Sequence, residues 1–86
     1  MQKIRTIDNQ FYRELGRKIR EMREKKDITQ RELAKGIGTS RALISDYENG
    51  YTKISPNRWN RICTVLGISS DIEINVEVGH KYARYH

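Results

Sequence analysis

The sequence QRELAKGIGTSRALISDYENG, residues 30–50, decides the fold because it contains two short helical patterns with a turn between them. Thr29 stands before the first pattern and Glu32 comes three residues later, which is the spacing of a capping box at a helix start. One apolar stripe then follows at helical spacing, on Leu33, Ala34 and Ile37.

The turn is marked by Gly36 and Gly38, because glycine tolerates the left-handed backbone of a sharp turn. Ser40 can cap the second helix, in which Ile44 and Tyr47 lie three residues apart and predict a buried face. Another face of this helix, together with its cap, carries short or hydrogen-bonding side chains: Ser40, Arg41, Ala42, Ser45 and Asp46.

This second face is suited to reading base edges. Arginine can donate two parallel hydrogen bonds to guanine, an alanine methyl group can contact thymine, serine can bond to several edges, and aspartate can accept from cytosine. Two helices that meet across a tight turn, with such a face on the second, give the helix-turn-helix geometry of major-groove readers. A carboxylate near phosphates is repelled, so Asp46 could instead hold Arg41 in place or face solvent.

The stretch ITQRELAKGIGTSRALISDYENG, with LGIS further on, resembles the signature of the Xre or Cro/CI-type family of phage repressors. The resemblance covers residues 13–69. It implies that Arg23 pairs with Glu48, the glutamate that ends the second helix of the motif. It also implies that Gln30 contacts the DNA backbone, a role that suits an amide donor at a helix start.

The loop after the second helix offers further donors to phosphate on an exposed segment. These donors are Asn49, Tyr51, Thr52 and Lys53. Packing of Tyr51 on the loop is the alternative to its phosphate contact. The net charge of +6 favours a polyanionic partner, although charge alone describes only solubility and non-specific binding.

Two more amphipathic helices are expected to flank the motif. The first runs from a cap at Asp8 or Asn9 to Lys26, with a core stripe on Phe11, Leu15, Ile19 and Met22. The last opens at Ser55-Pro56, with serine as cap and proline in the first turn, and ends at Gly67. Its apolar face consists of Trp59, Ile62, Val65 and Leu66. Cys63 is expected in the core or at a dimer surface, because no histidine or acidic pattern accompanies it.

Residues 71–78 read DIEINVEV, a strict alternation that predicts a half-buried strand. Its apolar positions are Ile72, Ile74, Val76 and Val78. No second clear strand is expected, so the strand needs a partner for its backbone groups. We expect the same strand of a second subunit, antiparallel across a two-fold axis, and pairing with residues 3–7 is the alternative. In this respect the chain resembles Cro repressors and HipB-type antitoxins.

Composition limits the class of protein. The 86 residues suffice for one small domain with a thin core. A single cysteine rules out an internal disulfide and fits a reducing compartment. The sequence has neither a membrane-length apolar run nor a signal-peptide pattern, so a cytoplasmic location is expected. It also has no triad, phosphate loop or metal-ligand cluster, so neither an enzyme nor a cofactor or metal site is expected.

The sequence therefore predicts an all-α fold with an added C-terminal β-strand: a lambda-repressor-like helix-turn-helix bundle of four helices, with strand pairing across a homodimer. The expected parts are an N-terminal arm (1–7), a DNA-binding domain (8–69), a dimerisation strand (70–79) and a basic tail (80–86). The predicted function is that of a sequence-specific transcriptional regulator, a homodimeric repressor that binds an inverted-repeat operator through its third helix in the major groove.

Two other functions stay open at this point. An antitoxin of the HipB type would bind a toxin protein and regulate its own operon, and an adjacent toxin gene or a co-purified partner would reveal it. A small modulator could keep the fold and lack DNA binding, and gel shifts at several salt concentrations would separate it from a DNA-binding protein.

Overall fold

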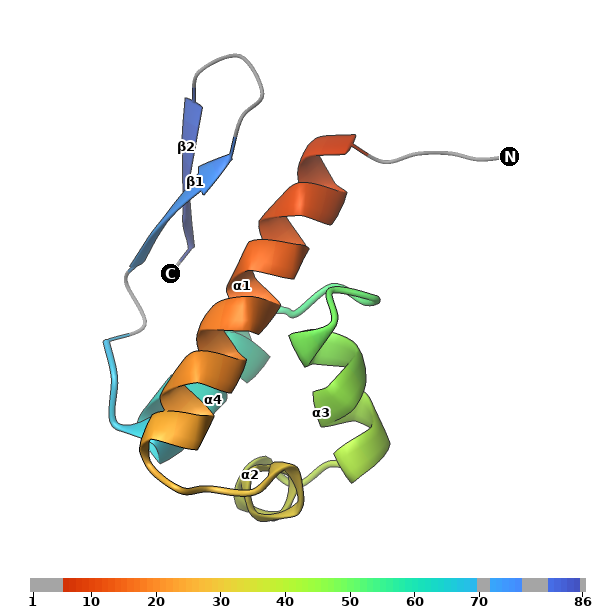
Figure 1. The fold of residues 1–86 in the computed structure, drawn as a ribbon, viewed down its shortest axis with the longest axis vertical. Helices are drawn as coiled ribbons and strands as arrows, with labels where there is room; N and C mark the ends of the chain where they lie inside the picture. The colour runs from red at the N-terminus through yellow and green to blue at the C-terminus, as the bar shows by residue number, and fades with distance from the viewer. Residues whose placement is uncertain (1–5, 70–71, 77–80, 86) are drawn as a thin grey trace.

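A computed structural model of the chain describes residues 6–69, 72–76 and 81–85. In it, four helices are followed by two strands (Figure 1). The elements are α1 (Thr6–Lys25), α2 (Gln30–Ile37), α3 (Arg41–Glu48), α4 (Pro56–Leu66), β1 (Ile72–Val76) and β2 (Lys81–Tyr85). No helix in this part of the chain is long and apolar enough to cross a membrane. The predicted four-helix bundle is confirmed.

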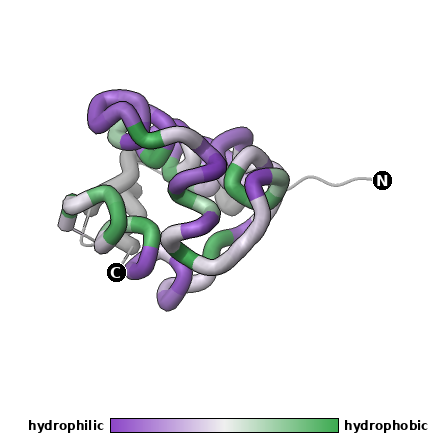
Figure 2. The backbone as a smooth tube through the Cα atoms, turned by 90° about the horizontal axis from the view of Figure 1, so that it is seen from below, coloured by the Kyte–Doolittle hydropathy of each residue, from purple (hydrophilic) through white to green (hydrophobic). Residues whose placement is uncertain are grey.

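The core forms where the apolar stripes of the four helices meet. Along the backbone of the bundle, hydrophobic and hydrophilic stretches alternate, so each helix offers an apolar side to its neighbours (Figure 2). The side chains with the least exposure come from every helix and from the loop before α4: Leu15, Ile19, Leu33, Ile44, Ile54, Trp59, Ile62 and Leu66. Burying one large apolar side chain contributes about 1.5–3 kcal/mol, so these contacts dominate the stability of the fold.

The capping box before α2 is confirmed. The Glu32 amide donates to Thr29 Oγ1 at 3.0 Å, and the Thr29 amide donates to Glu32 Oε1 at 2.9 Å. Gly38 ends the helix with φ at +75°, in the left-handed region that glycine adopts readily. Gly36 does not end the helix as expected, because it lies inside α2.

Serine caps begin the next two helices. Ser40 Oγ accepts from the Leu43 amide at 3.1 Å at the start of α3. Ser55 Oγ accepts from the Arg58 amide at 3.2 Å at the start of α4. Each bond satisfies an amide that has no partner within its own helix, so the sequence sets both helix starts locally.

The first helix starts earlier than predicted. It begins at Thr6, so the expectation that Asp8 or Asn9 caps it is wrong, and the last two residues of the predicted arm are helical. An acidic residue in the first turn of a helix is stabilised by the helix dipole, which is why Asp8 also suits a place inside the helix. Residues 1–5 of the arm lie outside the described residues.

The C-terminal segment contains a second strand that the sequence did not predict. β1 forms within the segment whose alternation predicts a strand, and it pairs antiparallel with β2, with Ile74 opposite Ala83. The expectation of no second strand is therefore wrong, and the strand Lys81–Tyr85 lies within the segment predicted as a basic tail. This segment contains two tyrosines, which favour strands, but it shows no apolar alternation. Residues 77–80 and 86 lie outside the described residues.

The backbones of α1 and α3 approach each other closely at Gly16. A Cβ atom at Gly16 would lie 2.0 Å from the Tyr47 carbonyl oxygen. Just beyond α3, Gly50 makes a similar approach to the backbone of Arg13. These contacts fix the C-terminal end of α3 against α1, and they leave the other side of α3 to solvent.

We expect Gly16→Ala to lower the free energy of unfolding by at least about 3 kcal/mol, because the added methyl group meets backbone that no rotamer change can move away. Urea denaturation measures this loss. Gly38→Ala is the control, since a Cβ there meets open space and only the backbone strain of about 1–2 kcal/mol remains. Equal losses in the two variants would contradict the close approach of α1 and α3.

Candidate nucleic-acid interface

Helix α3 separates its side chains into a buried and an exposed side. Ile44 and Tyr47 are buried in the core, as the periodicity predicted. The side chains of the predicted base-reading face lie at the surface: Ser40, Arg41, Ala42 and Asp46 are exposed, and Ser45 is half-buried. The fold therefore presents this set together on one helix, and its contact with bases stays a prediction.

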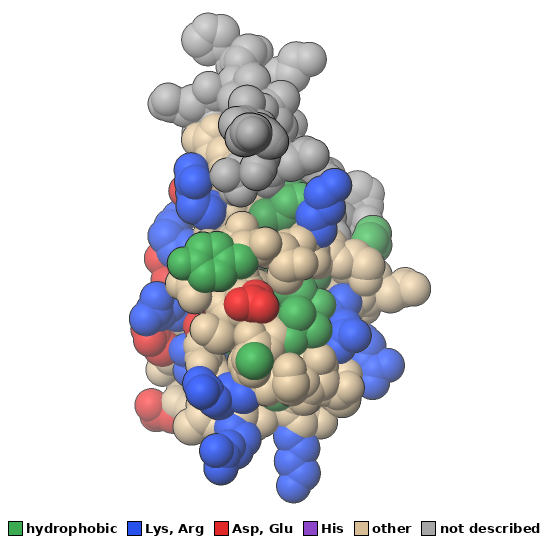
Figure 3. All heavy atoms as spheres, turned by 90° about the vertical axis from the view of Figure 1, so that its right-hand side faces the viewer, with side chains coloured by type: hydrophobic (Ala, Val, Ile, Leu, Met, Phe, Trp, Pro, Cys, Tyr) green, Lys and Arg blue, Asp and Glu red, His purple; other side chains and the backbone are tan. Residues whose placement is uncertain are grey.

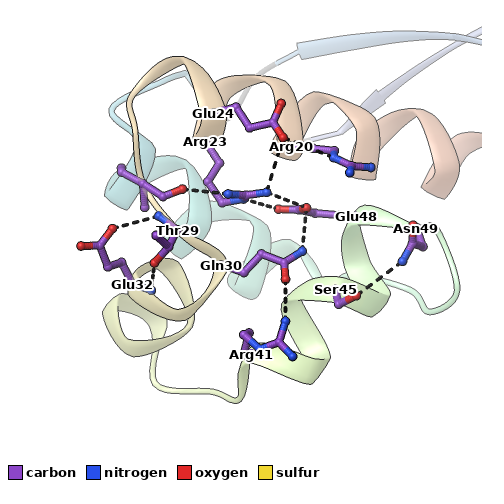
Figure 4. Close-up of polar contacts among 11 residues, drawn as sticks. Arg20, Arg23, Glu24, Thr29, Gln30, Glu32, Arg41, Ser45, Glu48 and Asn49 are labelled. Carbon is purple, nitrogen blue, oxygen red and sulfur yellow. Dashed lines mark hydrogen bonds and ion pairs between the residues drawn. The ribbon is translucent and has the colours of Figure 1, made fainter.

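An ion pair between Arg23 of α1 and Glu48 of α3 lies behind this face (Figure 4). Arg23 Nε donates to Glu48 Oε2 at 2.6 Å, and Nη2 donates to Oε1 at 3.1 Å. Only 11% of the Arg23 side chain and 2% of the Glu48 side chain are exposed. The hydrogen bond with Glu48 raises the pKa of the Arg23 guanidinium, although desolvation opposes it. This is the pair that the resemblance implied.

Gln30 connects the ion pair to the exposed face. Its Nε2 donates to Glu48 Oε1 at 3.0 Å, and its Oε1 accepts from Arg41 Nη1 at 3.1 Å (Figure 4). A carboxylate only accepts hydrogen bonds and a guanidinium only donates them, so the amide fits in one orientation. One side-chain N–H of Gln30 thus bonds to Glu48, and the other is left for the predicted phosphate contact.

Arg41 is therefore held by Gln30, and within the described part of the chain Asp46 forms no ion pair with it. The Asp46 carboxylate is exposed, and no ion pair of the described residues includes it. Of the readings open for Asp46, holding Arg41 is wrong. Contact with cytosine stays a prediction.

The loop after α3 carries the other predicted phosphate contacts. Asn49 and Lys53 are exposed, and Thr52 is half-buried. Asn49 Nδ2 lies 3.5 Å from Ser45 Oγ, which is the limit of a hydrogen bond. Tyr51 is 78% exposed, so the alternative in which it packs on the loop is wrong. All four side chains are positioned near the C-terminal end of α3.

Basic side chains surround the face that carries α3. Figure 3 looks onto this face, and Lys and Arg side chains occupy its margins while most of the central surface is uncharged. On α1 many cations are paired: Arg17 bonds to Glu14 and Glu21, and Arg20 lies 3.5 Å from Glu24. A surface of this kind suits a polyanion whose charges lie on either side of a central groove.

The Cys63 side chain lies in the core, which is one of the two places that the sequence predicted for it. Cys63 is buried, and desolvation raises the pKa of its thiol from 9.0 to about 12, so it carries no thiolate near neutral pH. In the same part of the chain, no group of three or more His, Cys, Asp or Glu side chains could hold a metal ion.

The predicted dimerisation residues fall on the hairpin. Ile72, Ile74 and Val76 occupy alternate positions of β1, and Val78 lies outside the described residues. The hydrogen bonds of β1 with β2 use one edge of the strand, and pairing of β1 with a second subunit stays a prediction.

Sequence reasoning missed the second role of Gln30. Its contacts with Arg41 and Glu48 span 11 and 18 residues, and no periodic pattern connects positions so far apart. Only the packing of α2 against α3 brings the three side chains together. The one available signal is that glutamine can donate and accept at once, which lets it stand between a carboxylate and a guanidinium.

Comparisons with known proteins agree with this geometry. The family profile HTH_3, described as helix-turn-helix, matches residues 19–72. The ImmF control region 10 kDa protein of Bacillus phage phi105 is 33% identical over 60 residues, which cover 70% of this chain and 67% of that protein. Antitoxin PezA of Streptococcus pneumoniae serotype 4 is 36% identical over 55 residues. They cover 64% of this chain and only 35% of the antitoxin.

Among solved structures, the P22 c2 repressor in complex with a synthetic operator is similar, with a TM-score of 0.62 and 30% identity. The matched region covers 65% of this chain and 85% of that chain. Its similarity assigns the four helices to the lambda-repressor-like arrangement that the sequence predicted.

Removing one partner of the buried ion pair leaves the other charge without compensation, which costs about 3–5 kcal/mol. We therefore expect Arg23→Leu to lower the free energy of unfolding by about that amount in urea denaturation. The double variant Arg23→Leu/Glu48→Leu should lose clearly less free energy of unfolding than the sum of the losses in the two single variants. Strictly additive losses would show that the two side chains do not stabilise each other.

Proposed function

The chain belongs to the helix-turn-helix family HTH_3, and from this premise we propose that it is a sequence-specific, DNA-binding transcriptional regulator. One observation carries the proposal. The exposed side of α3 presents Arg41, Ala42 and Ser45 together, while the opposite side is fixed in the core by Ile44 and Tyr47. A helix held in this way fits the major groove, which is about 12 Å wide.

Arg41 is the residue best placed to discriminate between bases. It stands in the first turn of α3, and its bond with Gln30 uses only one of the five N–H groups of a guanidinium. The remaining donors can form two parallel bonds with O6 and N7 of guanine, while Gln30 limits the positions that the side chain can adopt. Ala42 and Ser45 would read the next bases along the groove.

Contacts with phosphate would set the register of α3 on the duplex. Gln30 bonds to Arg41 in the first turn of α3, and Asn49, Tyr51, Thr52 and Lys53 follow the last residue of α3 along the chain. Backbone contacts at both ends of a recognition helix fix its orientation without selecting a sequence. The loop and Gln30 would therefore supply affinity for DNA of any sequence, and the exposed side of α3 would supply the preference for particular bases.

We infer a repressor that acts as a homodimer on an inverted repeat. The similarity to the P22 c2 repressor, which was solved in complex with a synthetic operator, supports the role in repression. Two copies of α3 about 34 Å apart would read two half-sites one helical turn apart. The hairpin offers the contact between copies, because a two-stranded sheet is marginal alone and keeps a free edge on each strand.

An antitoxin is the second candidate, and the similarity to PezA is the observation that favours it. The matched region covers about a third of that protein, 35% of its length, so the likeness concerns the helix-turn-helix part. An antitoxin role would add a toxin partner to DNA binding. Co-purification with the product of an adjacent gene would detect such a partner.

Selection of bound duplexes from a random pool tests base reading. We expect the wild-type protein to recover an inverted repeat, and Arg41→Ala to lose the preference for guanine at one position of each half-site. The loss on the preferred site should be about 1–3 kcal/mol, while binding to other sequences persists. Lys53→Gln is the control, because removing a phosphate contact weakens all sequences alike and lowers the salt slope by about 0.9. An equal loss on all sequences for Arg41→Ala would contradict base reading by this residue.

Introducing a negative charge on one or the other face of β1 tests the dimer contact. We expect Ile74→Asp to shift the protein toward monomer in sedimentation equilibrium and to weaken operator binding with it, because a carboxylate disrupts an apolar position. Asn75→Asp adds the same charge on the other face of the strand and should leave both properties unchanged. An unchanged dimer in Ile74→Asp would contradict a dimer contact through this face of the hairpin.

A further inference from the structure

A second basic surface lies where α2 and α4 meet, and the proposed DNA contacts do not use it. We call it the α2–α4 face. Its cations are Arg58 and Arg61 on α4. Arg61 is exposed, and Arg58 is half-buried. Helix α4 contains no acidic residue, and the one acid of α2, Glu32, bonds to the Thr29 amide.

Neither arginine forms an ion pair with an acidic side chain of the described residues. On α1, by contrast, Arg17, Arg20 and Arg23 each lie within 4.0 Å of a glutamate. The α2–α4 face thus carries a local excess of positive charge that this part of the chain does not neutralise. Such an excess favours an acidic partner.

Two adjacent hollows lie along this face and share Arg61. One has a volume of about 300 Å³ and is lined by Gly36, Asn60, Arg61, Thr64 and Val65. The other has a volume of about 450 Å³ and is lined by Ile37, Gly38, Ser55, Asn57, Arg58 and Arg61. Val65 and Ile37 make parts of the lining apolar, whereas arginine and asparagine side chains supply donors. An extended peptide with both carboxylates and apolar side chains matches this mixture.

The α2–α4 face and the proposed DNA contact lie on different sides of α2. Successive residues of an α-helix turn by about 100°, so Gly36 lies about 120° around α2 from Gln30. Gln30 is the residue of α2 that contacts Arg41. A duplex held by Arg41 and Gln30 would therefore lie on a different side of α2 from the hollow beside Gly36. A sugar–phosphate backbone also has no apolar side chain to cover Val65.

We propose that the α2–α4 face binds an acidic, extended segment of a partner protein. Carboxylates of this segment pair with Arg58 and Arg61, which can each donate two parallel hydrogen bonds. Apolar side chains of the segment cover the half-buried Val65, and the Asn57 and Asn60 amides bond to its backbone. Helix α3 stays free, so the protein can hold DNA and this partner at the same time.

The test uses a fluorescein-labelled decapeptide that alternates glutamate with alanine and valine, and fluorescence anisotropy measures its affinity for the full chain. We expect the wild-type protein to bind it more tightly than the same peptide with glutamine at each glutamate. The double variant Arg58→Glu/Arg61→Glu should bind the acidic peptide at least about tenfold more weakly than the wild-type protein. Arg61→Gln, a milder change at an exposed position, should weaken it in the same direction.

Lys25→Glu is the matched control, since it reverses one exposed charge in the last turn of α1, outside this face. It should leave peptide binding close to the wild-type value. Equal binding of the acidic and glutamine peptides, or equal loss in Lys25→Glu and the double variant, would overturn the proposal.

Operator binding by the same variants separates this face from the DNA contact. We expect the double variant to lose no more operator affinity than about twice the effect of Lys25→Glu, in line with its doubled charge change. A much larger loss, with a reduced salt slope, would overturn the proposal by making Arg58 and Arg61 phosphate contacts. Absence of operator binding in the wild-type protein would refute the proposed regulator function and leave the peptide result to stand by itself.

Discussion

The buried carboxylate of Glu48 is the constraint on which the arrangement of the helices depends. A charge that is only 2% exposed is tolerated only if other groups compensate it, and here Arg23 and Gln30 both donate to it. One donor comes from α1 and the other from the start of α2. The need to satisfy one carboxylate therefore fixes the end of α3 relative to two other helices, beside the backbone contact at Gly16.

This constraint extends to the exposed side of the molecule. Gln30 bonds to both the buried Glu48 and the exposed Arg41. The Arg41 side chain is therefore restricted to fewer rotamers before it binds DNA. Ordering a long side chain in advance reduces the entropy that binding must overcome. Stability and base recognition thus share one set of hydrogen bonds, which joins the buried interior to the first turn of α3. The α2–α4 face lies outside this set, which leaves it available for another partner.

Local signals predicted most of the fold. The spacing of Leu15 and Ile19, the Thr29–Glu32 capping box and the Ser40 cap depend on neighbours within one turn of helix, so the sequence displays them directly. Contacts between residues far apart in the sequence were harder to predict. The pairing of β2 with β1 joins two segments whose connection lies outside the described residues, and the bridge formed by Gln30 depends on how α2 packs against α3. The ion pair of Arg23 was predicted from family resemblance, because no periodicity relates positions 25 apart.

The most direct test of the account is a titration of the ¹⁵N-labelled protein with its selected operator, followed by NMR chemical shifts and compared with a scrambled duplex. The account predicts that the operator alone produces large shifts for Arg41, Ala42 and Ser45, including the Arg41 side-chain Nε–H group, while both duplexes shift the loop that contains Lys53. Shifts confined to α1 or α4, with the resonances of α3 unmoved, would contradict the claim that the exposed side of α3 reads DNA.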